Sequence, residues 1–112
     1  MIIYFASTNV LDTTTAFNLN MLNRKNRVLK MTGNVQGVFY RATAHKIANE
    51  IGVFGFVTNM ADGSVSIEAE GTDEQLIKMI EWCKKGPPNA KVIEINIQDG
   101  VFKGYKNFNI HY

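Results

Sequence analysis

The sequence has a single cysteine, two prolines and no long apolar run, and each scarcity excludes a class of protein. One thiol, Cys83, cannot form an internal disulfide, so a disulfide-stabilised secreted domain is not expected. No segment approaches the roughly 20 apolar residues that a membrane-spanning helix needs. The apolar residues 1–6 form a short stretch with no basic residue before it, unlike a secretory signal. We therefore expect a cytoplasmic protein with no membrane partner.

An excess of charge of one sign is also missing. Twelve basic and ten acidic side chains give a formal net charge of +2. A nucleic-acid-binding domain usually has a basic stripe with interleaved aromatic residues. The closest approach here is a short cluster at the predicted start of the first strand: Arg24, Lys25, Arg27 and Lys30. We expect it to be solvated and predict no nucleic-acid partner, although a contact with a phosphate backbone stays open as an alternative.

Patterns that bind metals or cofactors are missing as well. The two histidines, His45 and His111, have no metal-spaced partner, such as a second histidine three or four residues away. Cys83 has no activating base beside it and is expected to be a buried apolar residue. The sequence therefore predicts neither a metal site nor a cofactor.

The 112 residues suffice for one domain with one core. The beginning of the chain differs from the rest, because it carries one acid, Asp12, and no base before Arg24. We interpret residues 1–26 as an N-terminal extension, disordered or loosely docked, in which residues 2–6 could form an edge strand. Residues 27–112 are the predicted domain, which we expect to be freestanding and monomeric.

Hydrophobic periodicity predicts the order β-α-β-β-α-β followed by one more strand. Apolar residues cluster or alternate in five segments, at residues 27–32, 53–58, 65–70, 92–97 and 108–112. Helices are expected at 39–51, from apolar residues three and four apart, and at 72–85, which opens with a capping box. The Asp62-Gly63 turn predicts a hairpin. The plan is an α+β, ferredoxin-like sandwich, with two helices packed on one face of an antiparallel sheet.

The same patterns predict which side chains are buried. The second helix is expected to present its inner face through Leu76, Ile77, Ile80 and Cys83. Glu68 and Glu70 share one face of the third strand and are expected to face solvent.

The loop between the first strand and the first helix is the most informative segment. Its glycines, Gly33 and Gly37, allow the backbone to turn with its N–H groups inward, and such a nest binds anions. The helix that follows adds the positive end of its dipole. Arg41 lies in the first helical turn, where its guanidinium could bind phosphate oxygens in pairs. On spacing alone, an anion site and an empty loop are about equally plausible. The loop lacks the Gly-Lys-Ser/Thr ending of a nucleotide P-loop.

Two motifs resemble the signatures of the acylphosphatase family. The first is Gly33-x-Val35-Gln36-Gly37-Val38-x-x-Arg41, and the second is Gly55-Phe56-Val57-Thr58-Asn59 followed by Gly63-Ser64-Val65 and Gly71. The resemblance implies that Arg41 binds the phosphate and that Asn59 orients the attacking water. Without it, Asn59 would be read as a turn residue that closes a strand. The resemblance also implies a cradle of backbone amides, from Asn34, Val35, Gln36, Gly37, Val38, Phe39 and Tyr40.

The implied activity is hydrolysis of small acyl phosphates, by attack of water on phosphorus and without a metal. The leaving carboxylate has a conjugate acid with a pKa of about 4 to 5, so it departs without a general acid. The expected partners are the acyl phosphate substrate and inorganic phosphate, the latter as a product inhibitor. Two alternatives remain open. One is a non-catalytic acylphosphatase-like module that binds phosphate or RNA, and the other is a piece of a larger carbamoyl-transfer protein.

Overall fold

The structure is a computed structural model that describes residues 23–112. Its elements are β1 (Lys25–Asn34), α2 (Tyr40–Ile51), β2 (Phe54–Asn59), β3 (Val65–Gly71), α3 (Asp73–Lys85), β4 (Lys91–Gly100) and β5 (Phe108–His111). The order confirms the predicted β-α-β-β-α-β plan with a strand added at the end. The strand expected at residues 2–6 lies outside the described residues. β1 begins two residues earlier than predicted.

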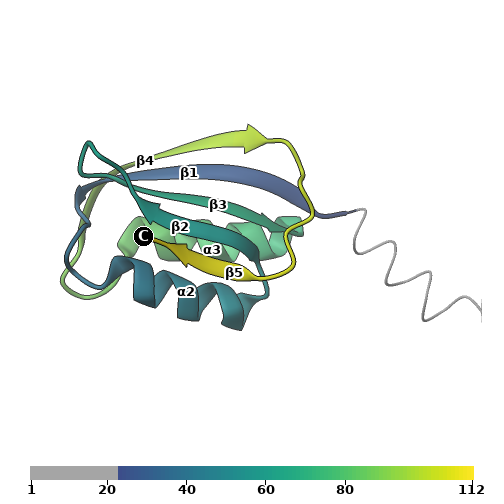
Figure 1. Ribbon diagram of the computed structural model, residues 1–112, viewed down its shortest axis with the longest axis horizontal. Helices are drawn as coiled ribbons and strands as arrows, with labels where there is room; N and C mark the ends of the chain where they lie inside the picture. The colour runs from purple at the N-terminus through teal and green to yellow at the C-terminus, as the bar shows by residue number, and fades with distance from the viewer. Residues whose placement is uncertain (1–22) are drawn as a thin grey trace, which may run out of the picture.

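The five strands form one sheet in the order β4-β1-β3-β2-β5. Both helices lie on the same face of this sheet, as the ferredoxin-like plan requires (Figure 1). Four strands pair antiparallel, and β2 and β3 form the predicted hairpin. The prediction of a wholly antiparallel sheet is wrong for β5, which pairs with β2 in parallel. The segment 101–107 crosses one end of the sheet, so β5 returns opposite to β4 and in the direction of β2 (Figure 1).

The core lies between the sheet and the two helices. Alternate residues of the strands enter it because successive side chains of a strand point to opposite faces. The buried apolar residues are Leu29, Met31, Val35, Tyr40, Ala44, Ala48, Val53, Val57, Val65, Ile67, Ala69, Leu76, Met79, Cys83 and Phe108. The prediction for Ile77 is wrong, because this side chain is 60% exposed and Met79 is buried instead. Leu76, Met79 and Cys83 share one face of α3, whereas Ile77 lies about 100° away from Leu76 around the helix.

Tyr40 and Cys83 join the two helices inside the core. The Tyr40 hydroxyl donates a hydrogen bond of 2.7 Å to the backbone carbonyl of Cys83. Burial raises the pKa of the Cys83 thiol to about 12. Cys83 is 0% exposed, which confirms the prediction that it is a buried residue of the core.

Glu70 is fully buried, so the prediction that it faces solvent is wrong. At the end of the sheet that it crosses, the segment 101–107 lies over the helix-free face and covers this carboxylate. The consecutive backbone N–H groups of Lys103, Gly104 and Tyr105 donate to it at 2.6, 2.9 and 2.8 Å. The Asn26 side-chain amide donates a fourth hydrogen bond, at 2.8 Å. Strand alternation gives the correct face for Glu70, but a segment distant in sequence decides whether that face is covered.

Because Glu70 accepts hydrogen bonds from three backbone N–H groups, we expect Glu70→Ala to lower the free energy of unfolding by about 3 kcal/mol or more. The loss arises because the part-buried backbone donors and the buried Asn26 amide are left without an acceptor. Urea denaturation of the purified protein measures it. The matched control is Glu94→Ala, at an exposed position on β4, which should change stability by less than about 0.5 kcal/mol. Equal effects of the two substitutions would contradict the anchoring role of Glu70.

Candidate active site

The loop from β1 to α2 turns sharply through two left-handed residues. Gly37 has φ of +75°, and Phe39 has φ of +65° and ψ of +24°. Phe39 was expected to begin the helix, but α2 begins at Tyr40 and Phe39 is its N-cap. A left-handed residue followed by a helical one points successive N–H groups to the same side, which makes an anion-binding nest. Phe39 is the one non-glycine residue with positive φ between residues 23 and 112, a strain typical of functional sites.

The N–H groups of this loop have no acceptor among residues 23–112. Across the described residues, no backbone N–H from Val35 through Tyr40 donates to a protein oxygen. The first N–H groups of any helix have no intrahelical partner. Here the N–H groups of the loop join them at the same end of α2. Val35 is buried and holds the loop against the core. The arrangement is suited to an anion, which would supply the missing acceptors.

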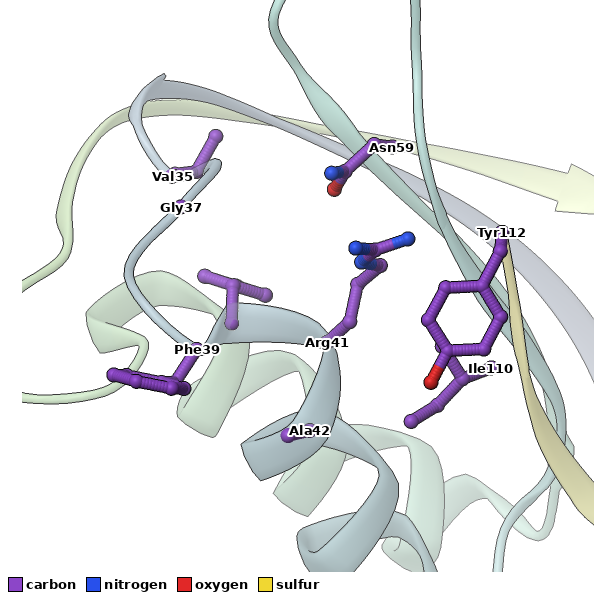
Figure 2. Close-up of a pocket in the computed structure, with 9 residues that line it drawn as sticks. Val35, Gly37, Phe39, Arg41, Ala42, Asn59, Ile110 and Tyr112 are labelled. Carbon is purple, nitrogen blue, oxygen red and sulfur yellow. The ribbon is translucent and has the colours of Figure 1, made fainter.

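Arg41 projects from the first turn of α2 toward the same pocket. Its Nη1 donates to the backbone carbonyl of His111 at 3.3 Å, and its guanidinium carbon lies 4.9 Å from the centre of the Tyr112 ring. Both contacts come from the end of the chain, on and just after β5. Figure 2 shows the guanidinium between the loop on one side and the Tyr112 ring on the other. One N–H contact is made, so the other donors of the fork are available to a ligand.

Asn59 reaches the pocket from the last position of β2. The Val57 side chain lies in the core, and the two-residue period of a strand gives Asn59 the same face. This face carries α2, so the amide of Asn59 points toward the guanidinium of Arg41 (Figure 2). Asn59 is half-buried, which leaves its amide accessible to water.

Arg41, Asn59 and the loop line one pocket of about 240 Å³. Its lining residues are Val35, Gly37, Phe39, Tyr40, Arg41, Ala42, Asn59, Ile110 and Tyr112. Four of the seven predicted loop residues are among them, whereas Asn34, Gln36 and Val38 are not. The sequence analysis missed Ile110 and Tyr112. Their alternation with Phe108 predicted a strand, but nothing local in the sequence predicts that this strand lies beside β2.

Arg41 is the one charged side chain that lines the pocket within the described part of the chain. Among residues 23–112 no carboxylate or imidazole lines it, so a bound phosphoryl group would meet a positive charge with no competing acid. In residues 23–112, no three His, Cys, Asp or Glu side chains are grouped to hold a metal ion. No helix in the same range is long and apolar enough to cross a membrane.

The fold and the pocket define a class of protein: a ferredoxin-like domain with an arginine-lined pocket where its first helix begins. The acylphosphatase sequence profile matches residues 27–110. An acylphosphatase of Methylococcus capsulatus is 40% identical over 74 residues, which are 66% of this chain and 80% of that protein. The chain belongs to the acylphosphatase family. The resemblance inferred from the two motifs is therefore confirmed.

Solved structures agree with this assignment. The structure of an acylphosphatase from Coxiella burnetii has a TM-score of 0.78 and 32% sequence identity, covering 82% of this chain and 97% of that chain. Full-length HypF has a TM-score of 0.74 and 30% identity over 80% of this chain, but the match covers only 12% of that protein. Similar domains thus occur by themselves and within a longer polypeptide.

Proposed function

We propose that the chain hydrolyses small acyl phosphates to a carboxylate and inorganic phosphate, with Arg41 and the loop amides binding the phosphoryl group and Asn59 orienting water. The observation that carries this proposal is the shared pocket. Arg41 comes from α2, Asn59 from β2 and the amides from the loop, yet all three line the same space. Phosphoryl transfer needs charge stabilisation and in-line positioning more than covalent help from the protein, and these groups supply both.

In the proposed reaction, the water oxygen forms a new bond to phosphorus as the bond from phosphorus to the acyl oxygen breaks. The carboxylate leaves with the bonding electrons and needs no proton, because its conjugate acid has a pKa of about 4 to 5 and is ionised at neutral pH. Asn59 accepts or donates hydrogen bonds but cannot be a strong base. No lining side chain in the described residues is a carboxylate or imidazole. We therefore assign the proton of the water to a phosphoryl oxygen of the substrate.

A purified preparation should hydrolyse benzoyl phosphate without added metal, and a chelator should not change the rate. Inorganic phosphate should inhibit competitively, because it occupies the same loop and guanidinium. The loss of absorbance as benzoyl phosphate is cleaved measures both effects. A phosphate monoester should be a poor substrate, since an alkoxide leaves far less readily than a carboxylate. Activity that appears only with added metal would contradict the proposal.

A nucleic-acid-binding module is less well supported. Three cations of the short basic cluster are paired with acids at the surface: Lys25 with Asp73 at 3.0 Å, Arg27 with Asp99 at 3.2 Å, and Lys30 with Asp62 at 2.8 Å. The fourth, Arg24, lies over the Phe54 ring and donates to the backbone carbonyl of Glu70. A phosphate backbone would have to compete with these contacts for each charge.

We also propose that the N-terminal extension, predicted at residues 1–26, lies outside the catalytic unit, since the family profile begins to match at residue 27. Its predicted boundary is two residues too late, because Lys25 and Asn26 belong to β1 and the Asn26 side chain donates to Glu70. A cytoplasmic location is consistent with one cysteine that is buried and reduced. We also propose that the protein is a monomer, because Arg41, Asn59 and the loop residues that line the pocket all come from one copy of the chain.

A further inference from the structure

The side chain of Gln36 connects two segments that flank the pocket, although Gln36 itself does not line it. Its Nε2 donates one hydrogen bond to the backbone carbonyl of Met60 and another to that of Ser64, both at 2.8 Å. Gln36 belongs to the loop, whereas both carbonyls belong to the turn between β2 and β3. Val35 and Gly37, the residues directly before and after Gln36, lie on one side of the pocket, and Asn59 lies on the other (Figure 2). The bridge therefore joins the loop that carries the backbone amides to the turn that directly follows Asn59.

The turn that accepts these bonds is rigid. The Met60 N–H donates to the Ser64 carbonyl at 2.8 Å, and the Gly63 N–H donates to the Met60 carbonyl at 3.2 Å. Asp62 accepts from the hydroxyl of Ser64 at 2.6 Å and pairs with Lys30 of β1 at 2.8 Å. The Lys30 ammonium, and after it the Ser64 hydroxyl, hold the pKa of Asp62 well below its usual range. Gln36 thus donates hydrogen bonds to a turn that its own contacts hold in place. Asn59 directly precedes the first residue of that turn.

The chemistry at position 36 is demanding. Each carbonyl already accepts a backbone N–H, so Gln36 must supply a donor to the second lone pair of both oxygens. A primary amide has two N–H bonds on one nitrogen and satisfies both carbonyls at once. A carboxylate has no donor and would repel both oxygens, and an apolar side chain would leave them without this partner.

We infer that Gln36 is a positioning residue that sets the separation between the phosphate-binding loop and Asn59. This inference rests on the proposed roles of Asn59 and the loop. The loop is held separately by Val35 in the core and by its continuation into α2, so phosphate should still bind when the bridge is lost. The water on Asn59 would then lie out of line with the bond that breaks, and a displacement of about 1 Å can cost about 100-fold in rate.

The test uses the full-length chain with benzoyl phosphate, and inorganic phosphate as the probe of binding. Gln36→Met keeps the length of the side chain but removes both donors. We expect kcat to fall about 10- to 100-fold, while the inhibition constant of phosphate changes less than about threefold. Gln98→Met, on the exposed side of β4, is the matched control and should leave both constants unchanged. A kcat within twofold of the native value, or equal losses in kcat and phosphate binding, would overturn the inference.

A double-mutant comparison separates positioning from general support of the fold. If Gln36 acts through Asn59, adding Gln36→Met to Asn59→Ala should cost less than about twofold more in kcat. Losses that multiply would overturn the inference. If instead Asn59→Ala alone kept full activity, the proposed role of Asn59 would fail, and the two failures are thereby distinguished. Thermal melting of each variant confirms that it is folded.

Gln36→Glu provides a second variant that does not depend on apolar packing. At neutral pH its carboxylate should weaken kcat at least as much as methionine does, because it faces two carbonyl oxygens. Protonation of that carboxyl restores a single donor, so kcat relative to the native chain should recover as the pH falls. A relative rate that stays flat with pH would count against the hydrogen bonds as the cause.

Discussion

Replacement of Arg41 by alanine is expected to lower kcat/KM for benzoyl phosphate by about 1,000-fold or more, and to remove inhibition by inorganic phosphate. The reason is that Arg41 is the one charged side chain lining the pocket within residues 23–112. No neighbouring cation there can replace its charge. Steady-state kinetics with and without added phosphate measure both effects.

Two further variants make this result specific. Arg41→Lys keeps the charge but loses the planar fork, so it should retain phosphate inhibition weakly and recover only part of the activity. Arg27→Ala removes an arginine that pairs with Asp99 on the sheet and should leave both constants near their native values. If Arg41→Ala were inhibited by phosphate as strongly as the native chain, the loop amides alone would bind the anion and the proposed role of Arg41 would be wrong.

For Asn59→Ala we expect a different pattern: kcat falls about 100- to 1,000-fold, but the inhibition constant of phosphate changes less than about threefold. An amide that orients the nucleophile contributes to the transition state and little to binding of the product. Measuring turnover together with competitive inhibition by phosphate separates the effect on the transition state from the effect on product binding.

The control for Asn59 is Asn96→Ala, which changes an exposed asparagine on β4 and should not affect catalysis. Both variants should fold, because Asn59 is half-buried and makes no side-chain hydrogen bond among the described residues that the fold would lose. Equal losses of turnover and phosphate binding in Asn59→Ala would show that Asn59 binds the phosphoryl group and does not orient water.

Features that depend on neighbours in sequence were predicted well. The capping box of α3 forms as expected, with Thr72 accepting from the Gln75 N–H at 3.3 Å and Gln75 accepting from the Thr72 N–H at 2.9 Å. The glycine-containing loop after β1 turns where its sequence indicated, and Arg41 follows in the first turn of α2. These elements are local because their hydrogen bonds and dihedral angles are decided within a few residues.

Predictions failed where a segment distant in sequence decides the environment. Glu70 lies on the face that its strand alternation predicts, yet it is buried because residues 101–107 cover that face. Ile77 was placed on the inner face of α3 by its hydrophobicity, although the sheet packs against the side carrying Met79. Phe39 is left-handed, a conformation that its own side chain disfavours and that the surrounding loop must impose.

The sequence by itself determined the order of helices and strands, the family and the identity of the two proposed catalytic side chains, since periodicity and short motifs encode all three. Only the tertiary structure decided that β5 runs parallel to β2, which brings the His111 carbonyl and the Tyr112 ring to Arg41. It also decided that the Gln36 side chain binds the turn that follows Asn59. Such contacts join residues far apart in the chain, and they form only when the complete sheet packs against its helices.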